Sequence, residues 1–463
     1  MLHGAALLNR THDLSDRVRE QIGRPRLLPV AVVVLLPVAR VKWRYTASLW
    51  IPPSMLRIRP FHAIRPPRSL APRVSSPPYD VISTTQARDL AADLPESFLH
   101  VIRPEIDLPV GADPYCDAVY EMARKCLDRM QNEGWLVQDE TARLFLYRQV
   151  IGDQQQTGLV CCCHVDDYNQ GRIKKHELTR QDKEDDRTRH LLTLGAHPGP
   201  VFLTFREEPT LTTLIERGKN SDPVAHFVAP DGVTHTAWAI EDPQPFIDAC
   251  GGLDGAYVAD GHHRTASAAR AAATRRDANA DHTGDESYNW FLAVLFPADD
   301  LTILPYNRVV SDLGDHDAAS FVEALKMIGS VSVTNEPIPE SPGTLCFYLD
   351  GVWHRLEIDP SEIDADDPIA SLDVSLLQHL VLEKILGIAD PTTDPRLGFV
   401  GGVHGCRELK DRVDCGKAAL GISMYPTSIT QLLDVSDAEK IMPPKSTWFE
   451  PKLRSGLFVH AFD

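Results

Sequence analysis

Several signatures of well-known protein classes are missing from this 463-residue sequence. No apolar run reaches the ~20 residues that a membrane-spanning helix needs. The nine cysteines include no C-x-x-C pair, which predicts reduced thiols and a cytoplasmic protein rather than a disulfide framework or a zinc ribbon. The phosphate loop G-x-x-x-x-G-K, the dinucleotide fingerprint G-x-G-x-x-G and the nucleophile elbow G-x-S-x-G are missing as well.

Positive charge is also in short supply. The formal net charge is −18 and the sequence pI is about 5.4, which argues against a general nucleic-acid binder. An apolar fraction of 43% is ordinary for a globular protein with a sizeable core. The expected partner is therefore a small-molecule substrate; neither nucleic acid nor a membrane is expected, and a homodimer is left open.

What the chain does contain is an alternation of strand-like and helix-like segments. The hydrophobic pattern predicts strands, two of which face each other across Gly152-Asp153 and two more across Asp350-Gly351, and several amphipathic helices. Phe98–Ile102 is expected to be a further strand. Mixed hairpins and helices favour an α/β fold of the mixed α+β kind over a clean doubly wound sheet.

The most informative segment is Asp260–Arg264. It follows the apolar run Ala256–Ala259 and precedes an alanine-rich segment from Thr265, which predicts strand, tight turn and helix. The first N–H groups of a helix lack intrahelical partners and the helix dipole is positive there, so Gly261, His262, His263 and Arg264 would form an anion site. The structural alternative is a capped turn with surface histidines.

Two segments in the first third of the chain offer carboxylates. Tyr79 and Asp80 follow two prolines and precede an expected helix, so they form either a substrate-binding corner or a rigid turn. Arg103 and Glu105 follow the expected strand Phe98–Ile102, where site residues of α/β proteins collect. A surface salt bridge is the alternative there.

Two later segments carry dense charge. His176-Glu177 does not complete H-E-x-x-H, so a zincin site is not expected, and the neighbouring Lys183 and Arg187 suit a phosphate or simply a solvated helix face. Lys445-Ser446-Thr447 resembles the end of a phosphate loop, but prolines precede it and the loop glycines are missing. These three residues are nevertheless candidates to line a pocket.

Taken in order, these motifs are recognisable. Arg59–Phe61, Pro77–Ser83, His176-Glu177, Asp260–Arg264, Pro443–Thr447 and Lys452–Gly456 resemble a widespread bacterial family known as a domain of unknown function. The resemblance covers about Met55 to Ala461. Asp-Gly-His-His-Arg also resembles the phosphate-binding box of the ParB/sulfiredoxin-like fold, and in particular of its free-serine kinases.

The second resemblance implies a function. Those kinases transfer a phosphoryl group from ATP, ADP or, in some relatives, pyrophosphate to the hydroxyl of free L-serine, and Mg²⁺ would be held here by Asp260. A nucleotide-binding switch of the ParB kind and a phosphate-ester or nucleotide hydrolase are the alternatives. The kinases' catalytic glutamate has two candidate counterparts, Glu105 and Glu177.

The expected roles follow from the motifs and this resemblance. Catalytic residues would be Asp260, His263, Glu105 and Glu177; phosphate-binding residues would be Gly261, His262, His263, Arg264, Lys183 and Arg187; substrate-binding residues would be Tyr79, Asp80, Arg103, Lys445, Ser446 and Thr447.

Three regions are expected along the chain. Residues 1–54 are expected to be a disordered extension or the product of a misassigned start codon, and a targeting signal or a structural arm are the alternatives. Residues 55–310 would form the phosphate-binding catalytic core, with a ParB/sulfiredoxin-like mixed sheet. Residues 311–463 would form a C-terminal α/β region packed on that core.

Overall fold

A central mixed sheet organises the protein. The computed structural model describes residues 55–462, and within them nine strands are joined in the order β6-β11-β8-β12-β5-β4-β10-β9, with β1 pairing to β5. The strands are β1 (Ile58–Arg59), β4 (Leu144–Ile151), β5 (Gln154–His164), β6 (Ile173–Lys174), β8 (Val201–Phe205), β9 (Ala225–Val228), β10 (Thr234–Ile240), β11 (Ala256–Asp260) and β12 (Trp290–Pro297). Pairs β12/β8 and β11/β6 are parallel and the others are antiparallel. The expected mixed α/β class is confirmed. The expectations for residues 1–54 lie outside the described residues.

Strand β5 shows why this sheet is buried on both faces. Cys161 and Cys163 point to one face and Cys162 to the other, and all three are wholly buried. The first two belong to one apolar cluster and Cys162 belongs to another. This is the period-two alternation of a strand. The turn to β4 uses Gly152 at φ 55°, in the left-handed region that favours glycine.

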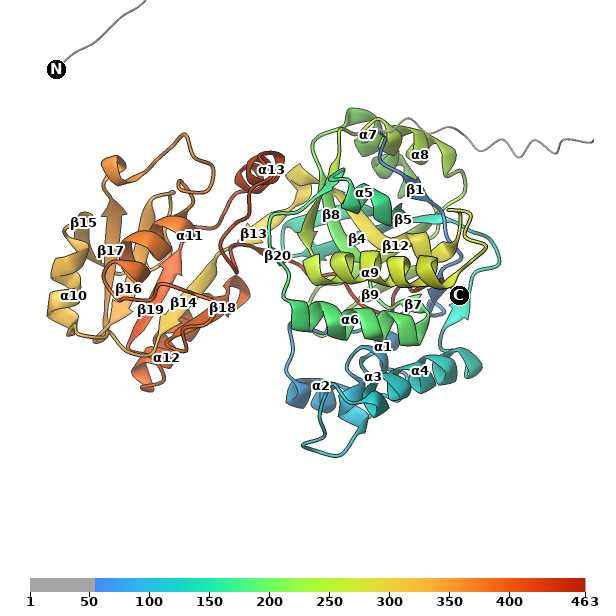
Figure 1. Cartoon of the computed structure of the whole chain (residues 1–463), viewed down its shortest axis with the longest axis horizontal. Helices are drawn as coiled ribbons and strands as arrows, with labels where there is room; N and C mark the ends of the chain where they lie inside the picture. The colour runs from blue at the N-terminus through green and yellow to red at the C-terminus, as the bar shows by residue number, and fades with distance from the viewer. Residues whose placement is uncertain (1–54, 463) are drawn as a thin grey trace, which may run out of the picture. The chain divides into compact units, whose positions relative to one another are not determined.

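Helices cover one face of the sheet and extend beyond its edge. Helices α9 (His262–Ala278) and α6 (Gln181–Leu194) lie side by side (Figure 1). The small side chains of Ala268, Ala271 and Ala272 let α9 pack closely onto the strands. The other helices are α1 (Ala71–Val74), α2 (Thr84–Ala91), α3 (Leu99–Ile102), α4 (Asp117–Asn132), α5 (Val165–Asn169), α7 (Pro209–Gly218) and α8 (Gln244–Gly251). Within residues 55–462, no helix is both long enough and apolar enough to cross a bilayer.

A second sheet forms from residues that follow the core strands. Its six strands, counted within the described range, run in the order β15-β17-β16-β19-β14-β18. They are β14 (Tyr306–Val310), β15 (Gly329–Thr334), β16 (Thr344–Leu349), β17 (Val352–Ile358), β18 (Leu397–Gly401) and β19 (Leu420–Met424). They are accompanied by α10 (Ala318–Leu325), α11 (Asp373–Leu376), a π-helical segment (Leu377–Glu383), α12 (Gly405–Asp414) and α13 (Ile429–Asp437).

The chain then returns to the central sheet. Strands β20 (Trp448–Glu450) and β21 (His460–Ala461) pair with β13 (Thr302–Leu304) and β7 (Ala196–His197), while β2 (Ile64–Arg65) pairs with β3 (Val137–Gln138). Phe449 packs on Phe202 and Phe458 on Phe145, with ring centroids 5.4 and 4.9 Å apart. The returning segment therefore covers the sheet face that α9 leaves free.

Local structure follows the sequence in most places. The hairpins at Gly152-Asp153 and Asp350-Gly351 are present, with Asp350 and Gly351 at φ 48° and 79°. The prediction of a strand at Phe98–Ile102 is wrong, because these residues form the short helix α3 instead. All five are buried, and a short apolar run that is buried all round has no periodicity to separate strand from helix.

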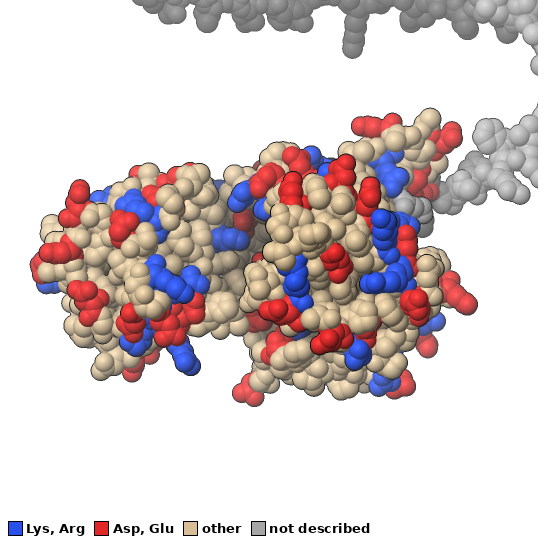
Figure 2. Space-filling model, turned by 90° about the horizontal axis from the view of Figure 1, so that it is seen from below, with Lys and Arg blue, Asp and Glu red and all other residues tan. Residues whose placement is uncertain are grey.

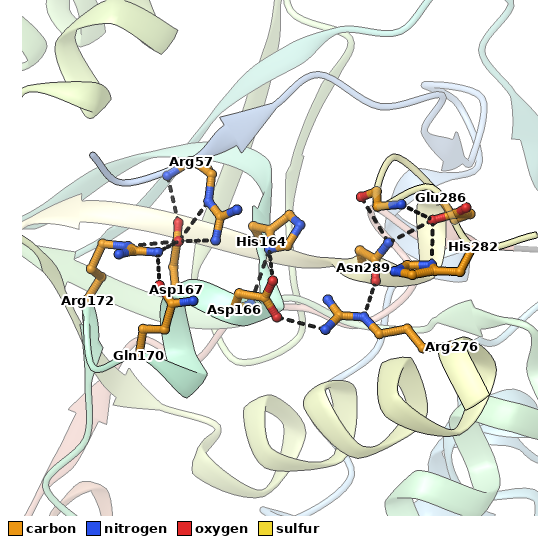
Figure 3. Close-up of polar contacts among 11 residues, drawn as sticks. Arg57, His164, Asp166, Asp167, Gln170, Arg172, Arg276, His282, Glu286 and Asn289 are labelled. Atoms are coloured by element: carbon orange, nitrogen blue, oxygen red, sulfur yellow. Dashed lines mark hydrogen bonds and ion pairs between the residues drawn. The ribbon is translucent and has the colours of Figure 1, made fainter. Parts of the chain in front are cut away.

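A buried polar cluster fixes the first strand to the sheet (Figure 3). The Asp167 side chain is 0% exposed and accepts hydrogen bonds from the Arg57 backbone N–H at 2.7 Å and from its Nε at 2.9 Å. Arg172 Nε donates to the same carboxylate at 2.9 Å. A buried carboxylate without a nearby cation is strongly unfavourable, so Asp167 and its two arginines stay together. Since Arg57 directly precedes β1 and Asp167 lies on α5, their contact holds the start of β1 against α5.

We expect Asp167→Asn to lower the free energy of unfolding by about 3 kcal/mol, since it leaves two partly buried guanidinium groups without their carboxylate. Denaturant unfolding followed by circular dichroism measures this. The matched control is Asp254→Asn at an exposed position, which should change stability by less than about 0.5 kcal/mol. Equal stability of the two variants would contradict the anchoring role.

Candidate functional site

A cavity of about 910 Å³ opens beside the N-terminus of α9. Segments that are far apart in the sequence line it: Tyr79–Thr84, Ile102–Glu105, Pro114–Tyr120, Glu177–His190, His263, Pro391–Thr393, Phe399 and Ile441–Lys445. Figure 2 shows one face of the molecule with acidic and basic side chains interspersed and a hollow near its centre. The cavity is large enough for a nucleotide-sized ligand.

The N-terminus of α9 forms one wall of this cavity. Strand β11 ends at Asp260, and Gly261 turns the chain with φ 96° before the helix starts at His262 rather than at Thr265 as expected. No side chain caps the first turn. His263 lines the cavity and its Nε2 accepts a hydrogen bond from the Arg180 backbone N–H at 3.1 Å. The uncapped N–H groups and the helix dipole favour an anion here.

Asp260 is held by a cation from the far end of the chain. Lys452 Nζ lies 3.1 Å from Asp260 Oδ2. Burial alone would raise the pKa of Asp260, but Lys452 and Arg264 outweigh it and hold that pKa below its usual range. Asp260 is therefore ionised at neutral pH.

Glu177 and Lys445 face the same cavity and influence each other. Burial is the main cause that raises the pKa of Glu177, and the charge of Asp260 adds to the rise. Lys445 and Lys452 oppose it. Enclosure alone would lower the pKa of Lys445, but Tyr306, Glu177, Asp80 and Asp260 raise it above its ordinary value. Within residues 55–462 no carboxylate pairs with Lys445, whose side chain stays exposed to the cavity. It is a charged donor available to an anion.

Tyr79 sits between two arginines. The Arg187 guanidinium lies 4.4 Å and that of Arg264 5.5 Å from the centre of the Tyr79 ring. Burial raises the pKa of Tyr79 to about 12, so its phenol remains protonated. Arg264 also lies 3.6 Å from Asp80. These contacts bring the Pro77–Ser83 motif against the start of α9.

The remaining charged residues of the cavity wall are mostly paired. Arg103 lies 2.7 Å from Glu105 and donates to the Tyr79 carbonyl at 2.8 Å, so it ties the two first-third motifs together. Arg187 pairs with Asp186 at 2.7 Å, and Tyr120 donates to the other oxygen of Asp186 at 2.8 Å. These groups shape the cavity more than they offer free charge.

The structure brings most of the expected residues together, though not all of them face the cavity. Tyr79, Asp80, Arg103, Glu105, Glu177, Lys183, Arg187, His263 and Lys445 line it. Arg264 lines a smaller adjoining space of about 40 Å³. Ser446 is buried, with its hydroxyl donating to the Pro443 carbonyl at 2.6 Å, and Thr447 contacts His176 at 3.5 Å.

Sequence reasoning did not assign Lys452, Tyr120 or Asp186 to the site. Lys452 stands in the recognised C-terminal motif, which was the signal that could have found it. Its pairing with Asp260 joins positions 192 residues apart, and no local pattern reports such a contact. Tyr120 and Asp186 lie on two different helices that only the tertiary fold brings together.

One group of side chains could hold a metal ion. His176, Glu177 and His262 each place a ligand atom within 4.8 Å of the others. Burial lowers the pKa of His176 to about 4 and that of His262 well below its ordinary value, so both imidazoles are neutral. Their rings are in edge-to-face contact at 4.4 Å, and His262 Nε2 accepts from the His176 N–H at 3.5 Å. Asp260, the metal ligand expected from the sequence, is not a member of this group.

The comparisons with known proteins agree with the sequence motifs at the level of the family. A family described as "Protein of unknown function (DUF1015)" matches residues 58–375. No curated protein matches the chain. Similar solved structures include a free serine kinase in complex with AMP, at 13% identity and a TM-score of 0.30, covering 63% of this chain and 86% of that one.

Two further solved structures are similar at the same distance. A conserved hypothetical protein from Pyrococcus furiosus shares 12% identity at a TM-score of 0.33, covering 66% of this chain and 95% of its own. SbnI from Staphylococcus aureus, with a C-terminal truncation, shares 11% identity at a TM-score of 0.33, covering 65% and 87%. At these scores, conclusions about the site depend on its own residues.

We expect Lys445→Gln to weaken the binding of inorganic pyrophosphate at least about tenfold, since it removes a charge-assisted hydrogen bond. Isothermal titration calorimetry measures this, and raising the salt concentration should reduce the difference between wild type and variant. Lys417→Gln, at an exposed position on the second sheet's side of the chain, is the control and should bind like wild type. Unchanged affinity in Lys445→Gln would remove Lys445 from the anion site.

Proposed function

The chain belongs to the DUF1015 family, and we propose that it is a phosphotransferase that moves a phosphoryl group from ATP, ADP or pyrophosphate to the hydroxyl of a small metabolite. Free L-serine is the acceptor that the Asp260–Arg264 motif implies by its resemblance. One observation carries the proposal: an uncapped helix N-terminus, an unpaired lysine and a carboxylate with a raised pKa meet in one cavity.

The donor phosphates would bind at the N-terminus of α9. The N–H groups after Gly261 point toward them, and His263 and Lys445 supply side-chain donors from two sides. Positioning and electrostatic stabilisation provide most of the catalysis in phosphoryl transfer, because the protein forms no covalent bond to the transferred group. The arrangement of fixed donors around one anion fits that requirement.

Mg²⁺ fits the same wall. Asp260 is ionised and lies beside the expected phosphate position, and Mg²⁺ in phosphoryl-transfer sites is bound by one or two carboxylates together with substrate phosphates. When bound, the ion would neutralise charge on the donor. Lys452 donates to Asp260 Oδ2, so Oδ1 would be the oxygen left for the ion.

Glu177 is our choice for the proton acceptor. The acceptor hydroxyl oxygen would form the new bond to phosphorus while the bond to the leaving phosphate oxygen breaks, and the hydroxyl proton would pass to Glu177. Glu177 is electrostatically coupled to Asp260, Lys445 and Lys452 at the phosphate end of the cavity. Glu105, the other candidate, is paired with Arg103 and receives a hydrogen bond from Thr84 at 3.3 Å.

The acceptor itself would lie against the remaining wall. Tyr79, Asp80 and Arg103 come from two adjoining segments and offer a phenol, a carboxylate and a guanidinium within one corner. An amino acid such as serine presents an ammonium group, which Asp80 would complement, while Arg103, paired with Glu105, would hold Tyr79 in this corner through the Tyr79 carbonyl. A homodimer remains a prediction.

A direct assay tests the proposed function. We expect O-phosphoserine when the full chain is incubated with L-serine, Mg²⁺ and, separately, ATP, ADP or pyrophosphate, detected by mass spectrometry. Release of phosphate without phosphoserine would identify a hydrolase instead. Retention of DNA at physiological salt would support the ParB-like switch, and no reaction with any donor would reject the kinase proposal.

The two glutamates can be separated by mutation. We expect Glu177→Gln to lower kcat by about 10²–10⁴ with little change in KM, because it removes the proton acceptor. Glu105→Gln should lower kcat less than about tenfold. Steady-state kinetics on both variants measures this, and the opposite ranking would transfer the role of base to Glu105.

A further inference from the structure

Arg308 is a buried cation that the site has not yet used. It lies on β14 of the second sheet and is 4% exposed. Its guanidinium packs 4.5 Å above the ring of Phe399, which lines the cavity. No carboxylate of residues 55–462 lies within ion-pairing distance of it, and burial lowers the pKa of Arg308 to about 9.

The hydrogen bonds of Arg308 all go to backbone carbonyls. Its Nη2 donates to Pro444 at 3.3 Å and to Lys445 at 3.0 Å, and its Nη1 donates to the carbonyl of Tyr306. Burying a charge without a counter-ion is costly, and an apolar side chain of similar size would often be at least as stable. Stability alone therefore does not explain an arginine at this position.

The carbonyls of Pro444 and Lys445 lie on either side of the Lys445 Cα, and Lys445 is the residue proposed to bind the anion. Lys445 has φ 59°, in the left-handed region that is strained for a residue with a Cβ and persists only where neighbours impose it. Arg308 bonds to the peptide groups on both sides of the Lys445 Cα. Thr427 supports the same loop from the second sheet's side by donating to the Ser446 carbonyl at 3.0 Å.

We propose that Arg308 is a positioning residue that holds Lys445 in its left-handed conformation and so directs the ammonium group into the cavity. Its own charge, behind the loop, adds to the positive potential that an anion meets. The second sheet would thereby influence the anion affinity of a cavity whose other phosphate-binding groups lie on α6 and α9. The proposal rests on the proposed function only in taking the anion to be the donor's phosphates.

A double-mutant cycle tests this coupling. The variants are Arg308→Met, Lys445→Gln and the pair, in the full chain, with pyrophosphate and ADP binding measured by calorimetry. We expect each single change to weaken binding about tenfold or more, and the double variant to be no weaker than about twofold beyond Lys445→Gln. Arg308→Lys should recover part of the affinity, since it keeps the charge but cannot bond to both carbonyls. Arg407→Met, 91% exposed on α12, is the control and should bind like wild type.

A second measurement does not depend on ligand binding. We expect hydrogen exchange of residues 443–447 and acylation of the Lys445 amine, both followed by mass spectrometry, to change in Arg308→Met and not in Arg407→Met. Thr427→Val should loosen the same loop, because it removes the hydrogen bond to the Ser446 carbonyl. It therefore tests the loop even if Arg308→Met folds poorly.

Each outcome decides between the two claims. Additive effects of Arg308→Met and Lys445→Gln, or an unchanged affinity with a lowered melting temperature, would reduce Arg308 to a structural residue. If wild type binds neither ligand and forms no phosphoserine, the proposed function fails. In that case unaltered exchange and amine reactivity in Arg308→Met would overturn the positioning role as well.

Discussion

The ion pair between Asp260 and Lys452 is the contact on which the site depends. It joins the end of β11 to a segment that arrives only after the chain has built the second sheet and returned. Three glutamines of the central hairpin hold that segment by its backbone: Gln149, Gln154 and Gln156 donate to the carbonyls of Lys452, Glu450 and Pro451. Without this docking, neither Lys452 nor the loop that carries Lys445 would face the start of α9.

This arrangement explains how an acidic protein can present an anion site. The net charge of −18 describes the whole surface, whereas affinity for a phosphate depends on the few groups within a Debye length of it. Around the cavity, Arg103 and Arg187 are neutralised by their own carboxylates. Lys445 is not, and the dipole of α9 adds to it. Selective pairing thus leaves Lys445 available to a ligand at the start of α9.

Much of the local structure could be predicted from the sequence, because local chemistry decides it. Asp350-Gly351 requires a left-handed turn, and Ser83 caps α2 through a reciprocal bond pair with Gln86, so both follow from residue type. The strand prediction for Phe98–Ile102 failed because burial on all sides removes the periodicity that separates strand from helix. The segment Asp260–Arg264 succeeded because glycine, strand end and helix start lie next to each other in the chain.

The candidate site was predictable only as a list of pieces. Most of the residues that the motifs named line the cavity, but the motifs did not show which of them would be paired. Arg103 and Glu105 neutralise each other, while Ser446 turns its hydroxyl to its own loop. Arg308 had no motif at all, since its role arises from carbonyls more than 130 positions away. Pairing and orientation are tertiary properties that residue identity does not encode by itself.

The long return of the chain has a consequence for the protein's biogenesis. Asp260 leaves the ribosome 192 residues before Lys452, a delay of about 10–40 s at 5–20 residues per second. Once β12 has followed, all nine strands of the central sheet have been synthesised, yet the face that Phe449 and Phe458 cover is still open. A nascent chain would thus expose apolar strands at a stage when Arg264, but not yet Lys452, can offset the charge of Asp260.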